Sequence, residues 1–324
     1  MSKSLMILGG SGFFGKTFLE SYLQEKLSEY KITKLILVSR NNKAIQKISK
    51  NSKKKITIFK KNLSNAKNIP FADYIIHAAE YVNSLKITRN YKKGLDLKTF
   101  DNVFKILSSK KFAKSKLIYI SSGSVYSERN SFQKKKLHEK SKIHLRRFEK
   151  LKTSHEIYVN NKIIGEQMTK NLSRDHGIKT SIVRSFALVG KHLPLNAQYV
   201  LGNFIFSILK KKPVKIFEKS SKSVFRSFMH TDDLVRWLMT IVKNSKVSCP
   251  IYNIGSNQPI SIWSLAKYIS KTYDLQFIYP KQENKKFDYY IPSTKKAQKN
   301  LGLKIKFDLK KSINYTLKTI NNLK

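Results

Sequence analysis

Short apolar runs alternate with longer amphipathic stretches through the first half of the chain. The apolar runs are rich in β-branched residues, which predicts strands, at Leu5–Leu8, Lys34–Val38, Thr57–Lys60, Tyr74–Ala78, Lys116–Ser121 and Thr180–Val183. The stretches between them, for example Gly15–Leu27 and Thr99–Ser108, have the spacing of helices. Alternation of this kind predicts an α/β fold, in which a doubly wound parallel sheet is covered by helices on both faces.

After about residue 184 the alternation loosens into loops and shorter elements. An apolar stretch covers Asn203–Leu209, and helical spacing covers Thr231–Val242 and Ile262–Ser270. We therefore predict two domains, the doubly wound sheet in residues 1–183 and a smaller α+β lobe in residues 184–324.

The composition is that of a globular protein, with 40% apolar residues in 324. No long apolar segment indicates a signal peptide or a membrane span. A single cysteine, Cys249, excludes an internal disulfide and makes a reducing cytoplasm the expected location.

The charge is unusual, because 65 Lys and Arg against 20 Asp and Glu give a net charge of +45. Such an excess is expected of proteins that bind nucleic acid, anionic membranes or acidic small molecules. Here the lysines are spread along the whole chain, which favours compositional drift over a polyanion partner. The densest run, Lys134 to Lys152, is predicted to be a solvated loop or helix face.

A glycine-rich segment, Gly9-Gly10-Ser11-Gly12-Phe13-Phe14-Gly15, joins the first predicted strand to the first predicted helix. Glycines at 9, 12 and 15 permit a tight turn, close approach of backbone to a pyrophosphate, and close packing of helix on strand. The helix N-terminus would bind the anion. The segment therefore predicts a dinucleotide site lined by Gly9, Ser11, Gly12, Phe13, Phe14 and Gly15.

The second predicted strand ends in Val38-Ser39-Arg40-Asn41, without the acidic residue that would bind the ribose 2′-hydroxyl of NAD. Arg40 could instead pair with a 2′-phosphate. This favours NADP over NAD, although a basic residue here is also common by chance in so lysine-rich a chain.

Two further segments are ambiguous when taken alone. Ser121-Ser122-Gly123-Ser124 places hydroxyl groups at the carboxyl end of a predicted strand, where ligands of such sheets bind and where ordinary turns also begin. The Tyr-x-x-x-Lys spacing occurs in three places, at Tyr22/Lys26, Tyr30/Lys34 and Tyr158/Lys162. The spacing by itself therefore selects none of them.

The order of the motifs is more specific than any one of them. GGSGFFG is followed by DYIIHAA at residues 73–79, SSGSVY at 121–126, YVNNK at 158–162, RSFMHTDD at 226–233 and YNIG at 252–255. Over essentially the whole chain this order resembles the extended short-chain dehydrogenase/reductase family, and within it the NAD-dependent epimerase/dehydratase group acting on nucleotide sugars. The resemblance implies a Rossmann-type NAD(P)-binding domain, a substrate-binding lobe, and a homodimer formed through two helices, one of which carries Tyr158.

The resemblance also assigns roles to residues. Tyr158 would be the acid/base, Ser122 would hydrogen-bond the reacting oxygen, and Lys162 would hold the nicotinamide ribose. A phenol titrates near pH ~10, and a lysine one helical turn away favours the phenolate. Further cofactor contacts are implied at Asn62, Leu63, Ala78 and Ala79, and substrate contacts at Ser122, Ser124, Asn203 and Arg226. His230, Asp232 and Asp233 are predicted to be structural, and the histidines show no metal-ligand spacing.

Departures from the family narrow the predicted reaction. Gly123 and Ser124 stand where the 4,6-dehydratases have an Asp-Glu pair, so dehydration is disfavoured. Decarboxylation is disfavoured as well, because the related decarboxylases tend to keep the Glu. Ala187 replaces an asparagine that many epimerases use on the sugar. We predict a nucleotide-sugar epimerase or 4-keto reductase, with reduction slightly favoured by Arg40. The alternative is a non-catalytic NADP-binding protein that uses its basic surface on RNA or another polyanion; intact Ser122, Tyr158 and Lys162 argue against it.

Overall fold

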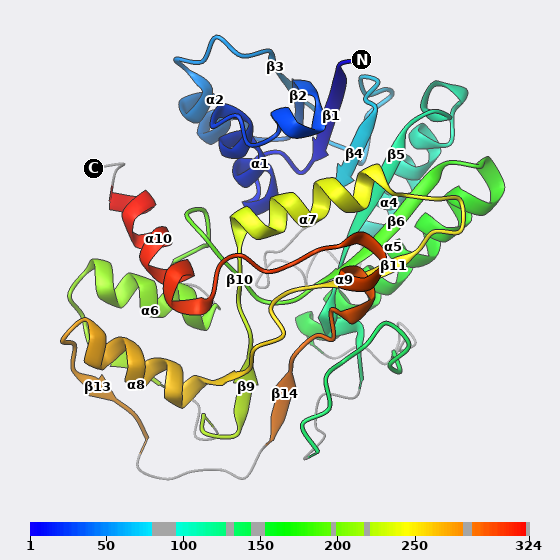
Figure 1. Cartoon of the computed structure of the whole chain (residues 1–324). Coiled ribbons are helices and arrows are strands. Elements are labelled where there is room, and N and C mark those ends of the chain that lie inside the picture. The colour runs from blue at the N-terminus through cyan, green and yellow to red at the C-terminus, as the bar shows by residue number, and fades with distance from the viewer. Residues whose placement is uncertain are drawn as a thin grey trace. The chain divides into compact units, whose positions relative to one another are not determined.

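The computed structural model describes residues 1–79, 95–127, 133–143, 153–195, 199–216, 221–280 and 287–321, with side chains described in these ranges except at 95–97. The chain forms two compact units (Figure 1). The first contains residues 1–125, 144–184 and 235–252, and the second contains residues 126–143, 185–234 and 253–324. The units therefore interleave along the chain, where the sequence predicted one boundary after residue 183.

The first unit is built on a seven-stranded sheet of order β11-β6-β5-β4-β1-β2-β3. Its strands are β1 (Lys3–Leu8), β2 (Ile32–Ser39), β3 (Ile56–Lys60), β4 (Tyr74–His77), β5 (Lys116–Ser122), β6 (Lys179–Ser185) and β11 (Ile251–Ile254). The pairs β1–β2, β1–β4, β2–β3 and β4–β5 are parallel. The predicted doubly wound parallel sheet is thus confirmed.

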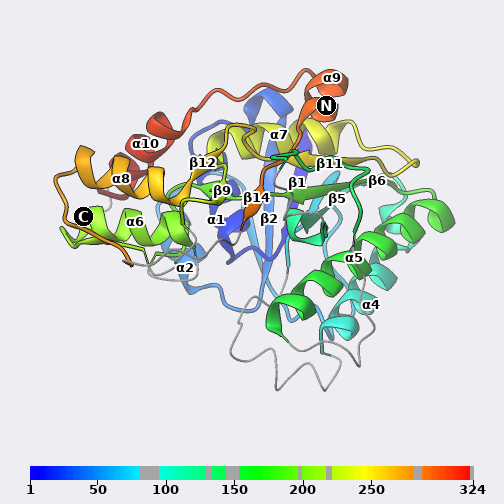
Figure 2. The same cartoon turned by 90° about the horizontal axis from the view of Figure 1, so that it is seen from below.

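Helices cover both faces of this sheet. They are α1 (Phe13–Leu23), α2 (Lys43–Ser49), α4 (Leu95–Leu107), α5 (Ser154–His176) and α7 (Thr231–Lys243), with the short 3-10 helices η1 (Ser28–Tyr30), η2 (Lys110–Phe112) and η3 (Gly123–Val125). Figure 2 shows α4 and α5 together on one face and α7 on the other. The central strand β1 is buried on both sides, because Leu5, Met6, Ile7 and Leu8 are fully covered, which is the reason that it reads as an unbroken apolar run.

The first helix is shorter than predicted. The sequence pattern predicted Gly15–Leu27, whereas α1 ends at Leu23. Glu25 adopts a left-handed conformation, with φ of 61°, which ends the helical path. Glutamate rarely marks such a turn, so the sequence carries no signal for this end.

The second unit has the α+β composition predicted for the C-terminal lobe. Its helices are α6 (Val200–Leu209), α8 (Ile262–Thr272), α9 (Lys295–Leu301) and α10 (Leu309–Asn321). Three small sheets accompany them, β12 (Ile260–Ser261) with β9 (Val224–Arg226) and β14 (Asp288–Tyr290), β10 (Met229–His230) with β7 (Leu188–Val189), and β13 (Phe277–Ile278) with β8 (Val214–Lys215). Phe204 and Ile205 of α6, Leu265 and Ile269 of α8 and Ile313 of α10 share one buried core.

No helix within the described ranges is long and apolar enough to cross a membrane.

Candidate active site

The glycine-rich turn is fixed by hydrogen bonds to the end of β2. The backbone N–H groups of Gly9 and Gly10 donate to the carbonyl of Val38 at 3.0 and 2.9 Å, and Gly12 donates to Gly9 at 3.0 Å. Gly9 has φ of +94°, and a Cβ added at Gly15 would lie 2.1 Å from the Gly10 carbonyl oxygen. These positions therefore require glycine, because the turn is left-handed at its start and tightly packed at its end.

The turn brings together several residues predicted to bind a dinucleotide. A Cβ on Gly9 would lie 2.8 Å from the Ala78 oxygen and 2.9 Å from the Ala79 Cα. The hydroxyl of Ser39 donates to that of Ser11 at 2.6 Å. Helix α1 begins directly after Gly12, an N-cap without a side chain. The first-turn N–H groups are thus left to a ligand, and the arrangement fits a pyrophosphate.

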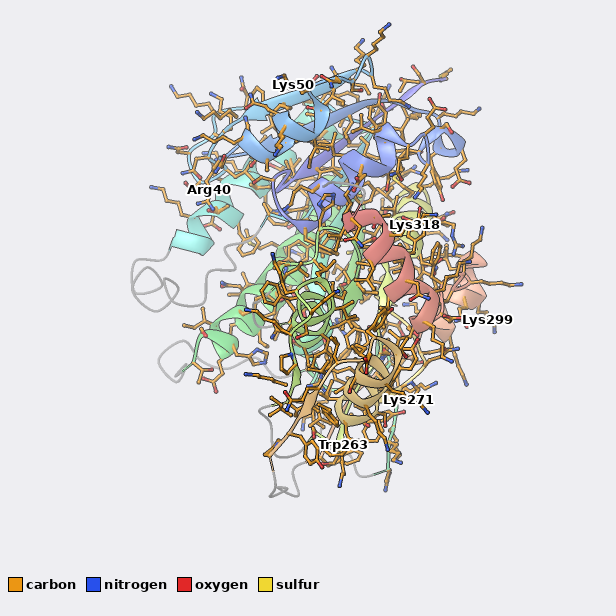
Figure 3. All side chains as sticks on the ribbon, turned by 90° about the vertical axis from the view of Figure 1, so that its left-hand side faces the viewer. Arg40, Lys50, Trp263, Lys271, Lys299 and Lys318 are labelled. Atoms are coloured by element: carbon orange, nitrogen blue, oxygen red, sulfur yellow. The ribbon has the colours of Figure 1, made fainter. Side chains whose placement is uncertain are left out.

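The other predicted cofactor residues differ in exposure. Arg40 follows β2 directly and is exposed (labelled in Figure 3). Asn62 accepts a hydrogen bond from the N–H of Ser64 at 3.4 Å. Leu63 is buried in the hydrophobic core that also contains Phe100, Val103 and Phe104 of α4.

The predicted catalytic residues meet where α5 packs on the end of β5. The Lys162 ammonium is buried, 5.6 Å from the centre of the Tyr158 ring, and donates to the Ile120 carbonyl at 2.7 Å. Ser122 lies two residues beyond Ile120 and is 6% exposed. Its hydroxyl oxygen accepts from the N–H of Ser124 at 3.1 Å. Two elements thus gather three residues that are far apart in sequence.

The two other Tyr-x-x-x-Lys pairs have no such arrangement. The Tyr22 hydroxyl donates to the Thr33 carbonyl at 2.7 Å, and α1 ends before Lys26. Tyr30 lies in η1, whereas Lys34 lies in β2. In neither pair do the Tyr and the Lys lie in the same helix. The four-residue spacing therefore does not place the two side chains on one helix face.

The family is shown by comparison with known proteins. The model of the NAD dependent epimerase/dehydratase family matches residues 5–255. This chain belongs to that family. Among curated proteins, UDP-glucuronic acid decarboxylases 2 and 4 of Arabidopsis thaliana are each 25% identical over 158 residues, 48% of this chain. The match covers only 35% of either relative, so the chain spans about a third of their length.

Solved structures of similar fold cover nearly the whole chain. UDP-glucose 4-epimerase of Thermotoga maritima has a TM-score of 0.75 at 18% identity and covers 99% of both chains. The dTDP-glucose 4,6-dehydratase DesIV of Streptomyces venezuelae has a TM-score of 0.78 at 14% identity, over 98% of this chain and 97% of DesIV. WbmF of Bordetella bronchiseptica, solved with NADH, has a TM-score of 0.74 at 18% identity, over 99% and 93%. At these identities the likeness establishes the fold alone.

In this member of the family a buried ion pair lies one helical turn beyond Lys162, a predicted catalytic residue, and sequence reasoning missed it. Glu166 lies one turn beyond Lys162 on α5, and Arg184 lies on β6; their side chains are 2% and 3% exposed. The guanidinium donates to both carboxylate oxygens, at 2.8 and 2.7 Å. The available signal was an arginine directly after the predicted strand Thr180–Val183, since a charge buried at a strand end requires a partner.

A buried histidine, also missed, ends β4 immediately before Ala78. His77 is fully buried against the rings of Phe100, Phe104 and Tyr119. Burial, and secondarily the charge of Lys162, lowers the pKa of His77 to about 3. The imidazole is therefore neutral near the predicted cofactor site.

The predicted substrate residues Asn203 and Arg226 belong to the second unit. The Arg226 guanidinium pairs with Asp288 at 2.7 Å and is 20% exposed. The side-chain oxygen of Asn203 is buried and has no hydrogen-bond partner among the described residues. An orphaned buried acceptor is what a substrate hydroxyl would satisfy. The roles of both residues stay predictions.

Two side chains of the RSFMHTDD motif, His230 and Asp233, accept hydrogen bonds from backbone amides. His230 accepts from the N–H of Asp232 at 3.1 Å through Nδ1, and the Asp233 carboxylate accepts from Lys306 and Phe307. These contacts are structural, as the sequence predicted. In the described part of the chain no group of three or more His, Cys, Asp or Glu side chains gathers as a metal site.

Proposed function

We propose that this protein is an NAD(P)-dependent enzyme that epimerises a nucleotide-activated sugar or reduces its 4-keto form. The observation that carries the proposal is the placement of the Lys162 ammonium beside the Tyr158 ring and on the carbonyl of Ile120, two residues before Ser122 at the end of β5. Family membership and the nucleotide sugars named for UDP-glucose 4-epimerase and DesIV support the substrate class.

The residues of the glycine-rich turn, with Ala78, Ala79 and Lys162, would hold the cofactor. When bound, a nicotinamide cofactor supplies hydride transfer to and from a sugar carbon. The structures solved with NADH for WbmF and with NAD for DesIV support this cofactor class.

Residues of this chain would carry out the proton transfer. Tyr158 would take the proton from a sugar hydroxyl or return it, because the Lys162 ammonium near its ring stabilises the phenolate. The Ser122 oxygen already accepts the Ser124 N–H, which leaves its own hydrogen to be donated to the reacting oxygen.

The residues after Ser122 favour these reactions over dehydration. Gly123 and Ser124 carry no carboxyl group, whereas elimination of water requires an acid and a base in addition to the tyrosine. UDP-glucuronic acid decarboxylases are among the relatives and DesIV is a dehydratase, so product analysis must accompany any assay.

The catalytic assignment is tested by Tyr158→Phe. Removal of the hydroxyl should lower turnover by at least about a hundredfold, since the proton has no other carrier, and should leave cofactor binding nearly intact. Tyr30→Phe, which alters another Tyr-x-x-x-Lys pair, serves as the matched control and should keep full turnover. Equal loss of turnover and cofactor binding in Tyr158→Phe would mean that Tyr158 is structural.

We propose NADP as the preferred cofactor, through a pairing of Arg40 with the 2′-phosphate. The native protein should bind NADPH more tightly than NADH, and Arg40→Asp should remove about a tenfold preference, because one charge-assisted contact is worth about that much. Lys50→Asp makes the same change of net charge at an exposed position and should leave the preference unchanged.

Mass spectrometry of nucleotides released by heat-denatured protein provides an independent check. NADP, or an empty site that prefers NADPH, would support a reductase that exchanges cofactor at each turnover. Tightly held NAD would contradict the role of Arg40 and indicate an epimerase that recycles its own hydride.

A further inference from the structure

The fold of the first unit gathers lysines that are far apart in the sequence. Strands β1, β4 and β5 are parallel, so they begin at the same edge of the sheet, where Lys3 opens β1 and Lys116 opens β5. Lys179 opens the neighbouring strand β6. Helix α7 ends at Lys243, whose carbonyl accepts from the Lys116 ammonium. These four residues, the amino-edge lysines, come from four separate elements.

The carboxylate beside the amino-edge lysines is already engaged. Asp73 immediately precedes β4, and its Oδ1 accepts from the Lys3 ammonium at 2.9 Å. Its Oδ2 accepts from the N–H and the hydroxyl of Ser4 at 2.9 and 2.8 Å. The negative charge of Asp73 therefore balances one lysine and leaves the other three uncompensated by it.

The amino-edge lysines repel one another. Burial, and then the charges of the other three, lower the pKa of Lys116. Lysines accumulated by compositional drift alone would extend apart into solvent, where water and salt screen like charges. A fold that instead holds four ammonium groups together has the charge arrangement of an anion-binding surface.

Two large apolar side chains are exposed at the same edge. Val247 is 47% exposed and follows Lys246, whose backbone pairs with the start of β6. Phe71 is 41% exposed and lies two residues before Asp73, whose carbonyl accepts from the N–H of Lys116 at 2.9 Å. Apolar side chains exposed beside a basic cluster are the combination that inserts into the interfacial layer of an anionic membrane.

The apolar side chains favour a membrane surface over nucleic acid. Nucleic acid binds to cations through its phosphates and to flat rings through its bases. Val247 offers no ring, and Phe71 already stacks on Phe112, with ring centres 6.4 Å apart. An anionic bilayer is attracted by lysines and accommodates both aliphatic and aromatic side chains.

We propose that the amino edge of the sheet, with the amino-edge lysines, Phe71 and Val247, is a docking surface for a bilayer that contains anionic phospholipid. The inference goes beyond the proposed function, because the glycine-rich turn follows β1 at the opposite, carboxyl edge of the same sheet. Docking at the amino edge would therefore leave the predicted cofactor turn uncovered. The attachment is electrostatic and reversible, so it requires no membrane-spanning helix.

The test is co-sedimentation with vesicles of an equimolar mixture of phosphatidylcholine and phosphatidylglycerol. The net charge of +45 attracts the whole chain to such vesicles, so each variant needs a control of equal charge. Lys179→Glu with Lys243→Glu changes the edge, and Lys271→Glu with Lys299→Glu makes the same change at exposed, outward-pointing positions of the second unit (Figure 3). The edge variant should lower the partition coefficient at least about tenfold and the control less than about twofold, since each lysine at the lipid surface contributes about fivefold. All four side chains are exposed, so both variants should fold normally.

The apolar contribution is tested separately. Val247→Ser should lower the partition coefficient about threefold, because its isopropyl group leaves water on insertion. Ile278→Ser changes another exposed β-branched residue, in the second unit, and should have no effect on partition.

The proposal is overturned if the edge and control lysine variants are weakened equally, or if Val247→Ser partitions like the native protein. Single-stranded RNA provides the remaining arm. If RNA binds more tightly than the vesicles and is lost in Lys179→Glu with Lys243→Glu, the edge is a nucleic-acid surface and the membrane assignment is wrong.

Discussion

At the scale of single residues, His77 has a direct consequence for the pH dependence of stability. It is completely buried, and neither ring nitrogen has a hydrogen-bond partner among the described residues. Its pKa is lowered to about 3, by burial and then by the charge of Lys162. The unfolded chain binds a proton at the ordinary histidine pKa near 6.5, and the folded protein does not until the pH is far lower.

His77 should therefore make the protein acid-labile. As the pH falls from 6.5 towards about 3, the unfolded state gains a proton that the folded state lacks, so stability is lost with falling pH. The loss between pH 7 and pH 5 should be about 2 kcal/mol from this residue alone. Denaturant unfolding at both pH values measures this loss. His77→Leu should reduce the loss of unfolding free energy between pH 7 and pH 5 by this amount, whereas His176→Asn, at an exposed position, should leave that loss unchanged. If His77→Leu loses as much unfolding free energy between pH 7 and pH 5 as the native protein does, His77 is not the source of the acid lability.

At the scale of elements, helix α5 positions Tyr158 and Lys162, two of the three predicted catalytic residues. It begins with a capping box, in which Thr153 accepts from the N–H of Glu156 at 3.2 Å and Glu156 accepts from the N–H of Thr153 at 3.0 Å. In its middle, a Cβ on Gly165 would lie 2.2 Å from the Tyr119 hydroxyl, so glycine permits close packing on β5. It ends at Gly177, with φ of 64°. The helix is thus fixed at its start, centre and end.

The cap should matter for activity as well as stability. Thr153→Ala should lower the free energy of unfolding by about 1 kcal/mol, because the first turn loses its side-chain acceptor. Tyr158 follows in the second turn, so fraying should also reduce turnover. Thr272→Ala, at the exposed end of α8, should change stability by less than about 0.5 kcal/mol and leave turnover unchanged. Unfolding and steady-state kinetics of the two variants decide the matter; equal effects would show that the cap has no special role.

At the scale of the whole molecule, the positive charge is distributed over both units. Lys50 in the first unit and Lys271, Lys299 and Lys318 in the second all point outward in Figure 3. In the densest basic run, Lys134, Lys135, Lys136 and Lys140 are exposed, while Leu137 is buried and exchanges backbone hydrogen bonds with Ile291 and Ser293. The run Lys134 to Lys152 was predicted to be a solvated loop or helix face; residues 134–143 form an exposed loop anchored by one apolar residue, and residues 144–152 lie outside the described residues. The homodimer through two helices, one of which carries Tyr158, stays a prediction.

The sequence by itself determined the succession of strands and helices along the first half of the chain, the glycine-rich turn and the family. Each of these depends on residues close together in the chain, such as the apolar run Leu5–Leu8 or the glycines between residues 9 and 15, where periodicity and backbone conformation are local properties. The division into two units was harder to predict from the sequence, because residues 235–252 belong to the first unit although residues 185–234 before them belong to the second.

Only the tertiary structure decided which charged and aromatic groups meet. The Tyr-x-x-x-Lys spacing does not separate the three pairs, and the order of the motifs selected Tyr158/Lys162; the fold places both residues of that pair on one helix against β5. Likewise, Arg184 meets Glu166, and His77 is enclosed by rings from α4 and β5, because β4, β5 and β6 are neighbours in the sheet. Periodicity states which face of an element is buried, but the partner buried against it is set by strand order, which no local pattern encodes.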